Sequence, residues 1–140
     1  MMLKRSFFII VIIFISVVAQ ADTLKPFTSD GCSAFPDGTF EQKSLWLNCC
    51  QRHDFDYWQG GTYQQRLMSD NRLKVCVSQV GEPTIASLML AGVRVGGTPY
   101  LPTSFRWGYG WSYPRLYGVL SEEELNQVLI LSEHLHFTKN

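Results

Sequence analysis

A histidine and an aspartate, His53 and Asp54, stand side by side in a stretch whose residues predict a helix. Neighbouring side chains on an α-helix point about 100° apart, so Asp54 addresses a ligand beside the histidine rather than pairing with it. A histidine with an ordinary pKa of about 6.5 can take up a proton near neutral pH. A carboxylate is a preferred ligand of hard cations such as calcium. The two residues are therefore a candidate general base and a candidate metal ligand.

Two helices joined by a short turn would position these residues. The first is predicted over 44–58 and ends at Gly60-Gly61, and the second is predicted over 62–80 with Thr62 as its N-cap. The apolar stripe of the second helix consists of Tyr63, Leu67, Leu73 and Val77. Asp70 falls within that stripe, where a carboxylate is costly unless it is paired or hydrogen-bonded. Asp70 therefore needs a partner on the facing helix.

The partner of Asp70 follows from the symmetry of a helical hairpin. In an antiparallel pair, residues that are equidistant from the turn face one another. The pairs His53/Asp70 and Cys49/Cys76 are both centred on the turn at 60–62, so one hairpin predicts both contacts. Asp70 would then fix the tautomer of His53 and stabilise the imidazolium as it forms.

The chain has four cysteines, which are Cys32, Cys49, Cys50 and Cys76. An even number of cysteines in an exported protein indicates disulfides, here with three possible pairings. The hairpin favours Cys49–Cys76 and leaves Cys32 with Cys50. A zinc site formed by Cys49, Cys50 and His53 is the alternative. Its spacing is not that of a structural zinc site, and export favours oxidation of the cysteines.

The loop over 29–38 precedes the first helix and contains Asp-Gly twice, at Asp30-Gly31 and Asp37-Gly38. Calcium takes six to eight oxygen ligands, and backbone carbonyls can turn towards an ion where the chain bends freely. The loop is not an EF-hand, and a turn pinned by Cys32 is the alternative interpretation. No serine or cysteine nucleophile is evident, so the base would activate water while a cation polarises a carbonyl. The residues predict metal-assisted hydrolysis of an ester.

The first 21 residues predict a secretory signal peptide. Lys4 and Arg5 precede an apolar run over 7–18, and Ala19-Gln20-Ala21 is a typical cleavage pattern. The apolar run is shorter than the roughly 20 residues that cross a bilayer, although a retained anchor is the alternative. We expect residues 22–140 to form one secreted or periplasmic domain.

The net charge of the mature chain limits the kinds of partner that it could bind by electrostatic attraction. Removal of Lys4 and Arg5 from 12 basic and 12 acidic residues leaves a net charge near −2 for the mature chain. This value gives no electrostatic basis for binding nucleic acid, and none for anchoring to an anionic membrane by charge alone.

The region over 81–140 is harder to interpret. Residues 85–95 are apolar and predict a helix or a strand, and a capping box at 121–124 opens a last helix. Between them, 96–116 is rich in glycine, proline and aromatic residues. This composition favours a loop that covers the core. Lipid contact by Trp107, Tyr109 and Trp111 is the alternative, because aromatic side chains with a polar edge favour the membrane–water interface.

The pattern Cys-Cys-x-x-His-Asp-x-x-Tyr at 49–57, with an aspartate and a cysteine on the next helix, resembles secreted phospholipase A2. Asp30-Gly31-Cys32 and Arg52-His53-Asp54-Phe55 resemble its bacterial and fungal branch more closely. The resemblance covers about residues 29–77, and 81–140 is poorly matched. It implies a mainly α, disulfide-linked phospholipase A2-like fold, with a calcium loop, two antiparallel core helices and a C-terminal helix.

The same resemblance implies roles for individual residues. His53 would be the general base, Asp70 its partner, and Tyr57 a residue that helps to hold Asp70. Calcium would be bound by the side chains of Asp30 and Asp54 and the carbonyl of Gly31. The expected substrate is the sn-2 ester of a glycerophospholipid at a membrane surface or in a micelle, and the products are a fatty acid and a lysophospholipid.

The chain departs from the family pattern in two places. The glycine-dense calcium loop of the animal enzymes is missing, and Asp56 and Ser69 occupy positions where many animal members carry a further disulfide. Two other interpretations remain: a catalytically silent phospholipase-like binding module, toxin or effector, and an envelope protein that uses calcium only for structure. Loss of the base or of the calcium aspartate would favour the silent module, and His53 and Asp54 are both present.

Overall fold

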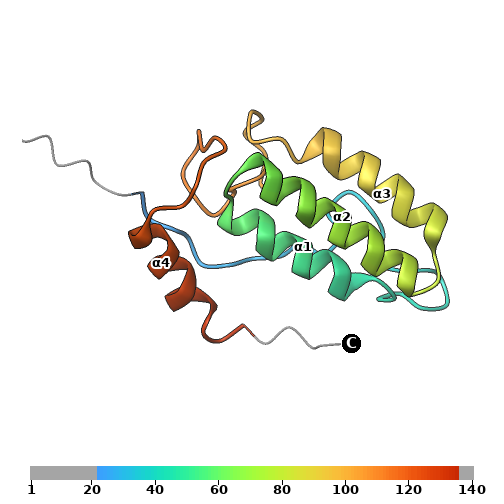
Figure 1. Ribbon diagram of the computed structural model, residues 1–140. Coiled ribbons are helices and arrows are strands. Elements are labelled where there is room, and N and C mark those ends of the chain that lie inside the picture. The colour runs from blue at the N-terminus through green and yellow to red at the C-terminus, as the bar shows by residue number, and fades with distance from the viewer. Residues whose placement is uncertain (1–21, 136–140) are drawn as a thin grey trace, which may run out of the picture.

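The computed structural model describes residues 22–135, which form four helices and no strand. The helices are α1 (Leu47–Gln59), α2 (Tyr63–Gln79), α3 (Pro83–Gly96) and α4 (Glu122–Ser132). Figure 1 shows α1, α2 and α3 side by side, with α2 packed against both neighbours, while α4 lies apart from them. The predicted signal peptide over 1–21 lies outside the described residues. The chain is thus mainly helical over its described part.

The predicted hairpin is present as α1 and α2. Gly60 and Gly61 both adopt positive φ angles of 72° and 129°, which allow the chain to reverse between the helices. Thr62 caps α2 in a capping box with Gln65, as the sequence predicts at this position. The first helix begins at Leu47 rather than at residue 44 because the residues before Leu47 form turns.

Two disulfides fasten the hairpin to itself and to the loop before it. Cys49 and Cys76 join α1 to α2, and Cys32 and Cys50 join the 29–38 loop to α1. Both pairings are those that the hairpin argument predicts. The disulfides pack in a core with five buried residues: Trp46, Leu73, Val77, Ala86 and Met89. Stable disulfides indicate an oxidising compartment.

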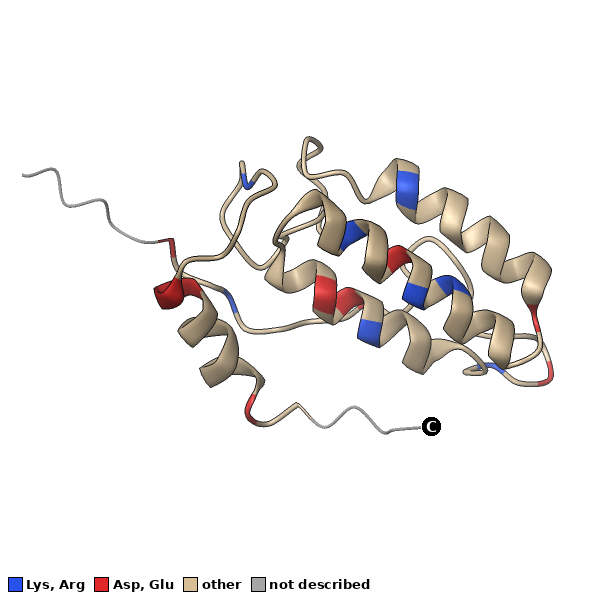
Figure 2. Ribbon diagram, viewed as in Figure 1, with Lys and Arg blue, Asp and Glu red and all other residues tan. Residues whose placement is uncertain are grey.

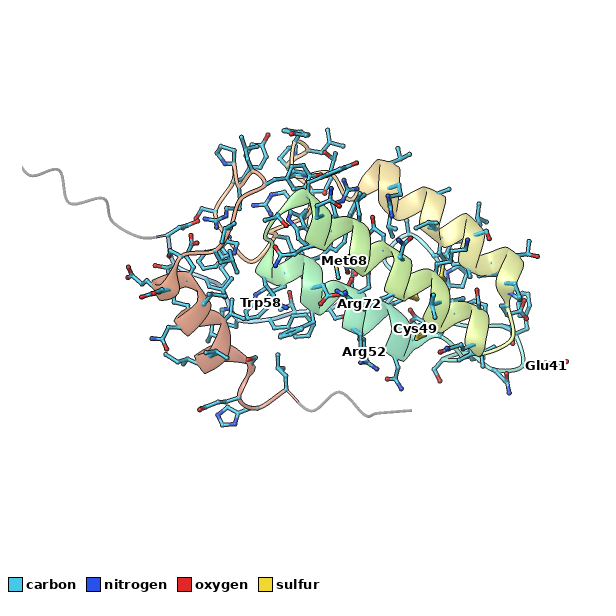
Figure 3. All side chains as sticks on the ribbon, viewed as in Figure 1. Glu41, Cys49, Arg52, Trp58, Met68 and Arg72 are labelled. Carbon is cyan, nitrogen blue, oxygen red and sulfur yellow. A yellow bond between two sulfur atoms is a disulfide. The ribbon has the colours of Figure 1, made fainter. Side chains whose placement is uncertain are left out.

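A third link between α1 and α2 involves Asp56 and Ser69. The Ser69 hydroxyl donates to Asp56 Oδ2 at 2.8 Å, and Arg72 forms an ion pair with the same oxygen at 2.7 Å. Figure 3 shows Arg72 on the face where α2 lies against α1. A polar bridge therefore joins α1 to α2 at Asp56 and Ser69.

The buried stripe of α2 differs from the predicted one at its first turn. Tyr63 is 49% exposed, whereas the charged residue Arg66 is 4% exposed. The Arg66 guanidinium donates to the hydroxyls of Tyr57 and Tyr117 and to the backbone carbonyls of Val93 and Arg94. A charged group is tolerated in the interior when its donors are satisfied in this way. Arg66, and not Tyr63, therefore occupies the buried position in the first turns of α2. The prediction that placed Tyr63 in the core is wrong.

The apolar stretch after α2 forms a helix, α3, which starts with Pro83 at its first turn. Arg94 is the one charged residue between Pro83 and Gly96, and Figure 2 shows this single charge near the end of α3. None of the helices in the 22–135 region has both the length and the apolar character needed to cross a membrane.

The aromatic segment after α3 belongs to the core at the end of α1. Trp107 and Trp111 are 1% and 0% exposed, and their indole N–H groups donate to the carbonyls of Gly61 and Gln59. The backbone N–H groups of Gly108 and Gly110 donate to the carbonyls of Tyr57 and Trp58. The segment thus satisfies the free carbonyls of the last turn of α1. The burial of Trp107 and Trp111 confirms the expected loop that covers the core and contradicts the alternative of membrane contact by these two side chains.

Tyr109, the third of these aromatic residues, is half-buried, and its hydroxyl donates to the carbonyl of Thr28. It therefore ties the aromatic segment to the chain just before the 29–38 loop. Like the two tryptophans, it serves to hold separated segments together.

A second buried cluster joins the two ends of the described chain. Leu24 and Val128 pack with Trp58 and Trp111, and Figure 3 shows Trp58 on the side of α1 that faces α4. α4 begins with the predicted capping box at 121–124. This cluster anchors the segment that leads into the 29–38 loop.

Candidate active site

His53 and Asp70 meet across the α1–α2 interface. His53 Nε2 lies 2.9 Å from Asp70 Oδ1, and the two side chains are 7% and 0% exposed. A carboxylate accepts hydrogen bonds, so the proton of the neutral imidazole resides on Nε2. The lone pair of Nδ1 is then available to accept a proton. The structure brings together the two residues that the hairpin argument paired.

Asp70 is held by two further side chains. The Tyr57 hydroxyl donates to Asp70 Oδ1 at 2.7 Å, and Arg94 Nε lies 2.8 Å from Asp70 Oδ2. The Arg94 contact is an ion pair without hydrogen-bond geometry. Burial and the charge of Asp70 raise the pKa of Tyr57 above its usual range, which keeps this hydroxyl a donor. Three partners therefore compensate a fully buried carboxylate.

Arg66 supports this arrangement from behind. Its Nε donates to the Tyr57 hydroxyl at 3.1 Å, and its Nη2 donates at 2.8 Å to the carbonyls of both Val93 and Arg94. These bonds connect α2 with the end of α3. The position of Arg94 relative to Asp70 is thereby fixed through the backbone.

Asp54 occupies the neighbouring face of α1, in different surroundings. Its Oδ2 accepts a hydrogen bond from the Ser29 hydroxyl at 2.6 Å. Burial raises the pKa of Asp54 to about 7. The Ser29 hydrogen bond offsets part of the rise, and the charges of Asp30 and Asp37 add to it. A carboxylate with acidic neighbours and one hydroxyl partner is suited to receive a cation.

Gly31 is fixed beside Asp54 by its backbone conformation. Its φ angle is 76°, and a Cβ atom at this position would lie 2.4 Å from Asp37 Oδ1. That same oxygen accepts a hydrogen bond from the Cys32 N–H at 2.9 Å. Only glycine fits at this position. Gly31 and Asp54 both line the same cavity.

Asp30, the third expected calcium ligand, is placed differently. Its side chain is exposed, and its Oδ1 accepts a hydrogen bond from the Ser33 hydroxyl at 2.8 Å. Asp30 is absent from the lining of the cavity that contains Gly31 and Asp54. Within residues 22–135, no three His, Cys, Asp or Glu side chains form a group that could hold a metal ion. The oxygens available beside His53 are those of Asp54, Ser29 and the loop backbone.

A largely apolar cavity of about 530 Å³ adjoins these groups. Its polar side chains include His53, Asp54 and Tyr57. Apolar side chains from α2, α3 and the flanking loops line the rest, among them Phe35, Leu73, Met89 and Val93. Leu88, Val95 and Phe105 line the cavity and are also exposed, so the approach to it is apolar. The cavity suits a ligand with an apolar chain and a reactive polar group.

Sequence reasoning missed Arg66, Arg94 and Ser29. Arg94 carried a signal, because it is a single charge in an otherwise apolar stretch, and such a charge requires a partner when its helix packs. Arg66 and Ser29 carried none, since polar residues at a helix start or in a loop are ordinary. Their roles depend on contacts with distant segments.

Comparison of this chain with protein-family models, with curated proteins and with solved structures found no match in any of the three.

Proposed function

We propose that this protein is a calcium-dependent phospholipase A2-type enzyme that hydrolyses the sn-2 ester of glycerophospholipids. One observation carries the proposal: His53, whose Nε2 contacts Asp70 Oδ1, lines a largely apolar cavity together with Asp54. This combination suits a base that acts on water next to an apolar substrate. The resemblance of 49–57 and of the following aspartate and cysteine to secreted phospholipase A2 supports the same assignment.

In the proposed reaction, His53 Nδ1 takes a proton from a water molecule while the water oxygen attacks the ester carbonyl carbon. Asp70 stabilises the resulting imidazolium through the proton on Nε2, and Tyr57 and Arg94 hold Asp70 in place. His53 then returns the proton to the departing alcohol oxygen. The products are a fatty acid and a lysophospholipid.

The groups beside His53 fit calcium in chemical type. Asp54, the Gly31 carbonyl and the Ser29 hydroxyl would supply oxygen ligands, and a dication would compensate the buried Asp54 carboxylate. Asp30 would have to leave Ser33 in order to contribute. When bound, calcium would polarise the ester carbonyl and stabilise the charge that develops on its oxygen.

A phospholipid membrane surface or micelle is the proposed partner. The exposed side chains at the cavity entrance, Leu88, Val95 and Phe105, are apolar. They would contact acyl chains at the surface while the reactive ester reaches His53. The proposed location is outside the cytoplasm, in the periplasm or beyond the cell.

A phospholipase-like binding module without catalysis is the second candidate. It is favoured by the placement of Asp30 outside the cavity, because this leaves the protein with few side-chain ligands for calcium. Such a module would bind phospholipid vesicles and release no fatty acid.

Fatty-acid release from mixed phospholipid vesicles, with calcium or with EDTA, tests the proposal. We expect release only with calcium, and a loss of at least about 10²-fold in His53→Gln with an unchanged circular dichroism spectrum. His134→Gln, a change at an exposed histidine, is the matched control and should retain full activity. Activity in His53→Gln would contradict the mechanism, and activity in EDTA would contradict the metal assignment. Vesicle binding without release would favour the binding module.

Gly92 provides a test of whether an acyl chain enters the cavity. It lines the cavity from α3, and a Cβ atom added there meets nothing within 4 Å. We expect Gly92→Leu to narrow the cavity without disturbing the fold and to shift preference towards shorter acyl chains. Ser87→Leu, on α3 but outside the cavity lining, should leave the preference unchanged.

A further inference from the structure

Arg94 connects α3 to the candidate base. It is the one charged residue of α3, a helix whose apolar side chains line the cavity and the core. It lies outside the stretch that resembles phospholipase A2. Its Nε is 2.8 Å from Asp70 Oδ2, the oxygen that neither His53 nor Tyr57 contacts. Arg94 therefore supplies the positive charge next to a carboxylate that is 0% exposed.

The protonation of Asp70 decides which nitrogen of His53 carries the proton. An ionised carboxylate can only accept, so it selects the tautomer with the proton on Nε2. A protonated carboxyl can donate instead, which would place the imidazole proton on Nδ1 and leave that nitrogen without a lone pair to accept a proton. Burial without a counter-charge favours the protonated form. The choice between these states therefore depends on the neighbouring cation.

We propose that Arg94 is a positioning residue for His53: by pairing with Asp70 it keeps this carboxylate ionised and thereby holds His53 as the Nε2–H tautomer. The catalytic consequence rests on the proposed function, because Nδ1 is the proposed base. The tautomer itself does not, since it is a property of the resting protein whether or not it hydrolyses an ester.

The contacts of Arg94 use more than one nitrogen of its guanidinium group, so a lysine can reproduce only some of them. Its Nη2 donates to the Leu67 carbonyl at 3.1 Å, while Arg66 binds the Arg94 carbonyl at 2.8 Å. The guanidinium thus reaches Asp70 and the backbone of α2 at the same time. A lysine ammonium also carries a positive charge, but it has one nitrogen. It can balance the charge of Asp70, but its position is held less firmly than that of the guanidinium.

The test compares Arg94→Gln and Arg94→Lys with the wild type and with Arg72→Gln. Arg72 also joins α1 and α2 through an ion pair with an aspartate, but its partner is Asp56 rather than Asp70, and it is 57% exposed. Folding is checked by circular dichroism. The first readout is the nitrogen-15 NMR spectrum of the His53 ring in EDTA at about pH 8, above the ordinary histidine pKa.

We expect the Nε2–H tautomer in the wild type, in Arg72→Gln and in Arg94→Lys, and a shift towards Nδ1–H in folded Arg94→Gln. An unchanged tautomer in folded Arg94→Gln would overturn the proposal. So would a wild-type His53 that carries its proton on Nδ1, a result that requires no variant and remains decisive if Arg94→Gln does not fold.

The second readout is hydrolysis of a short-chain phospholipid at saturating calcium. We expect kcat of Arg94→Gln to fall about tenfold or more with KM changed less than about twofold, partial recovery in Arg94→Lys, and no change in Arg72→Gln. An effect on KM alone would overturn the positioning role. Absence of hydrolysis in the wild type, together with the expected tautomers, would contradict the proposed function and leave the role of Arg94 intact.

Discussion

His53 and Asp54 are consecutive residues on α1, yet their surroundings are opposite in charge. The carboxylate behind His53, Asp70, is surrounded by an imidazole N–H, a phenol and a guanidinium. Asp54 has one hydroxyl partner and two acidic neighbours, and burial raises its pKa to about 7. One half of the candidate site is therefore fully compensated by the chain itself, and the other half is not.

The difference indicates how the two halves are assembled. The groups around His53 come from α1, α2 and α3, which pack together, so His53 is positioned by the fold alone. The Asp54 half depends on a loop, and under the proposed function its counter-charge would come from a bound cation. Ligand binding and stability should therefore be coupled at Asp54 and not at His53.

Removal of the charge from each carboxylate should change stability in opposite directions. In EDTA at about pH 8, we expect Asp70→Asn to lower the free energy of unfolding by about 2–4 kcal/mol, because Arg94 loses its counter-charge. Asp54→Asn should raise it by about 1–3 kcal/mol, because an uncompensated buried carboxylate is replaced by a neutral amide. Urea unfolding measures both values.

Added calcium provides the control for this pair. Calcium should stabilise the wild type and Asp70→Asn and should have little effect on Asp54→Asn. Two destabilised variants would show that Asp54 is already compensated within the protein. The contrast between the two halves would then be wrong.

Removal of either disulfide should lower stability by a similar amount, but each removal should affect a different half of the candidate site. They close loops of 18 residues (Cys32–Cys50) and 27 residues (Cys49–Cys76), each of which corresponds to about 3 kcal/mol. Replacement of Cys32 and Cys50 by serine should weaken calcium binding, because this disulfide ties the loop of Gly31 to α1. Replacement of Cys49 and Cys76 should lower kcat instead, because it loosens the contact between α1 and α2.

Thermal unfolding measures the stability of these variants, and calorimetric titration measures their affinity for calcium. Equal losses of calcium affinity in both double variants would indicate that the loop and the hairpin form one cooperative unit. The assignment of one disulfide to each half would then fail.

The His53 half could be predicted from the sequence because its residues lie close together in the chain and are placed symmetrically about one turn. The pairs His53/Asp70 and Cys49/Cys76 share one turn, and glycines and a capping box mark that turn. The Asp54 half was harder to predict, because the direction of a loop side chain depends on its tertiary neighbours. Asp30 and Asp37 are both in the loop sequence, and only the structure shows Asp37 bound to the Cys32 N–H and Asp30 exposed.

The aromatic segment shows a different limit. Trp107 and Trp111 are aromatic residues of the kind found at membrane interfaces, but their indole N–H groups donate to the carbonyls of Gly61, in the turn after α1, and of Gln59, the last residue of α1. Local composition does not reveal which distant helix end a loop will cover. For the same reason Arg66 was not predicted to be buried, since its acceptors lie on α1, on α3 and at Tyr117.

The pH dependence of stability should report the Asp54 half. The Asp54 pKa is 3.8 ordinarily and about 7 in the folded protein, so between these values the folded state holds a proton that the unfolded chain has lost. Stability without metal should therefore decrease as pH rises from about 4 to about 7, by about 1–3 kcal/mol. Because other groups also titrate, the measured quantity is the difference between wild type and Asp54→Asn in EDTA. A difference that does not vary with pH would contradict the raised pKa.

Two hydroxyl groups, one in each half, allow the finest comparison. The Tyr57 hydroxyl donates to Asp70 and accepts from Arg66, whereas the Ser29 hydroxyl donates to Asp54. Removal of one buried hydrogen-bonding group costs about 1–2 kcal/mol. We expect Tyr57→Phe to lower kcat by a few-fold at saturating calcium and to leave calcium affinity unchanged, because His53 still contacts Asp70.

Ser29→Ala should give the reverse pattern. Loss of its hydrogen bond would raise the pKa of Asp54 further and weaken calcium binding, while kcat at saturating calcium should be retained. Calcium titration and initial rates on a short-chain phospholipid measure both variants. If Tyr57→Phe weakened calcium binding as much as Ser29→Ala does, the two halves would be coupled through α1. The base would then be positioned partly by the metal, and not by Asp70, Arg94 and Arg66 alone.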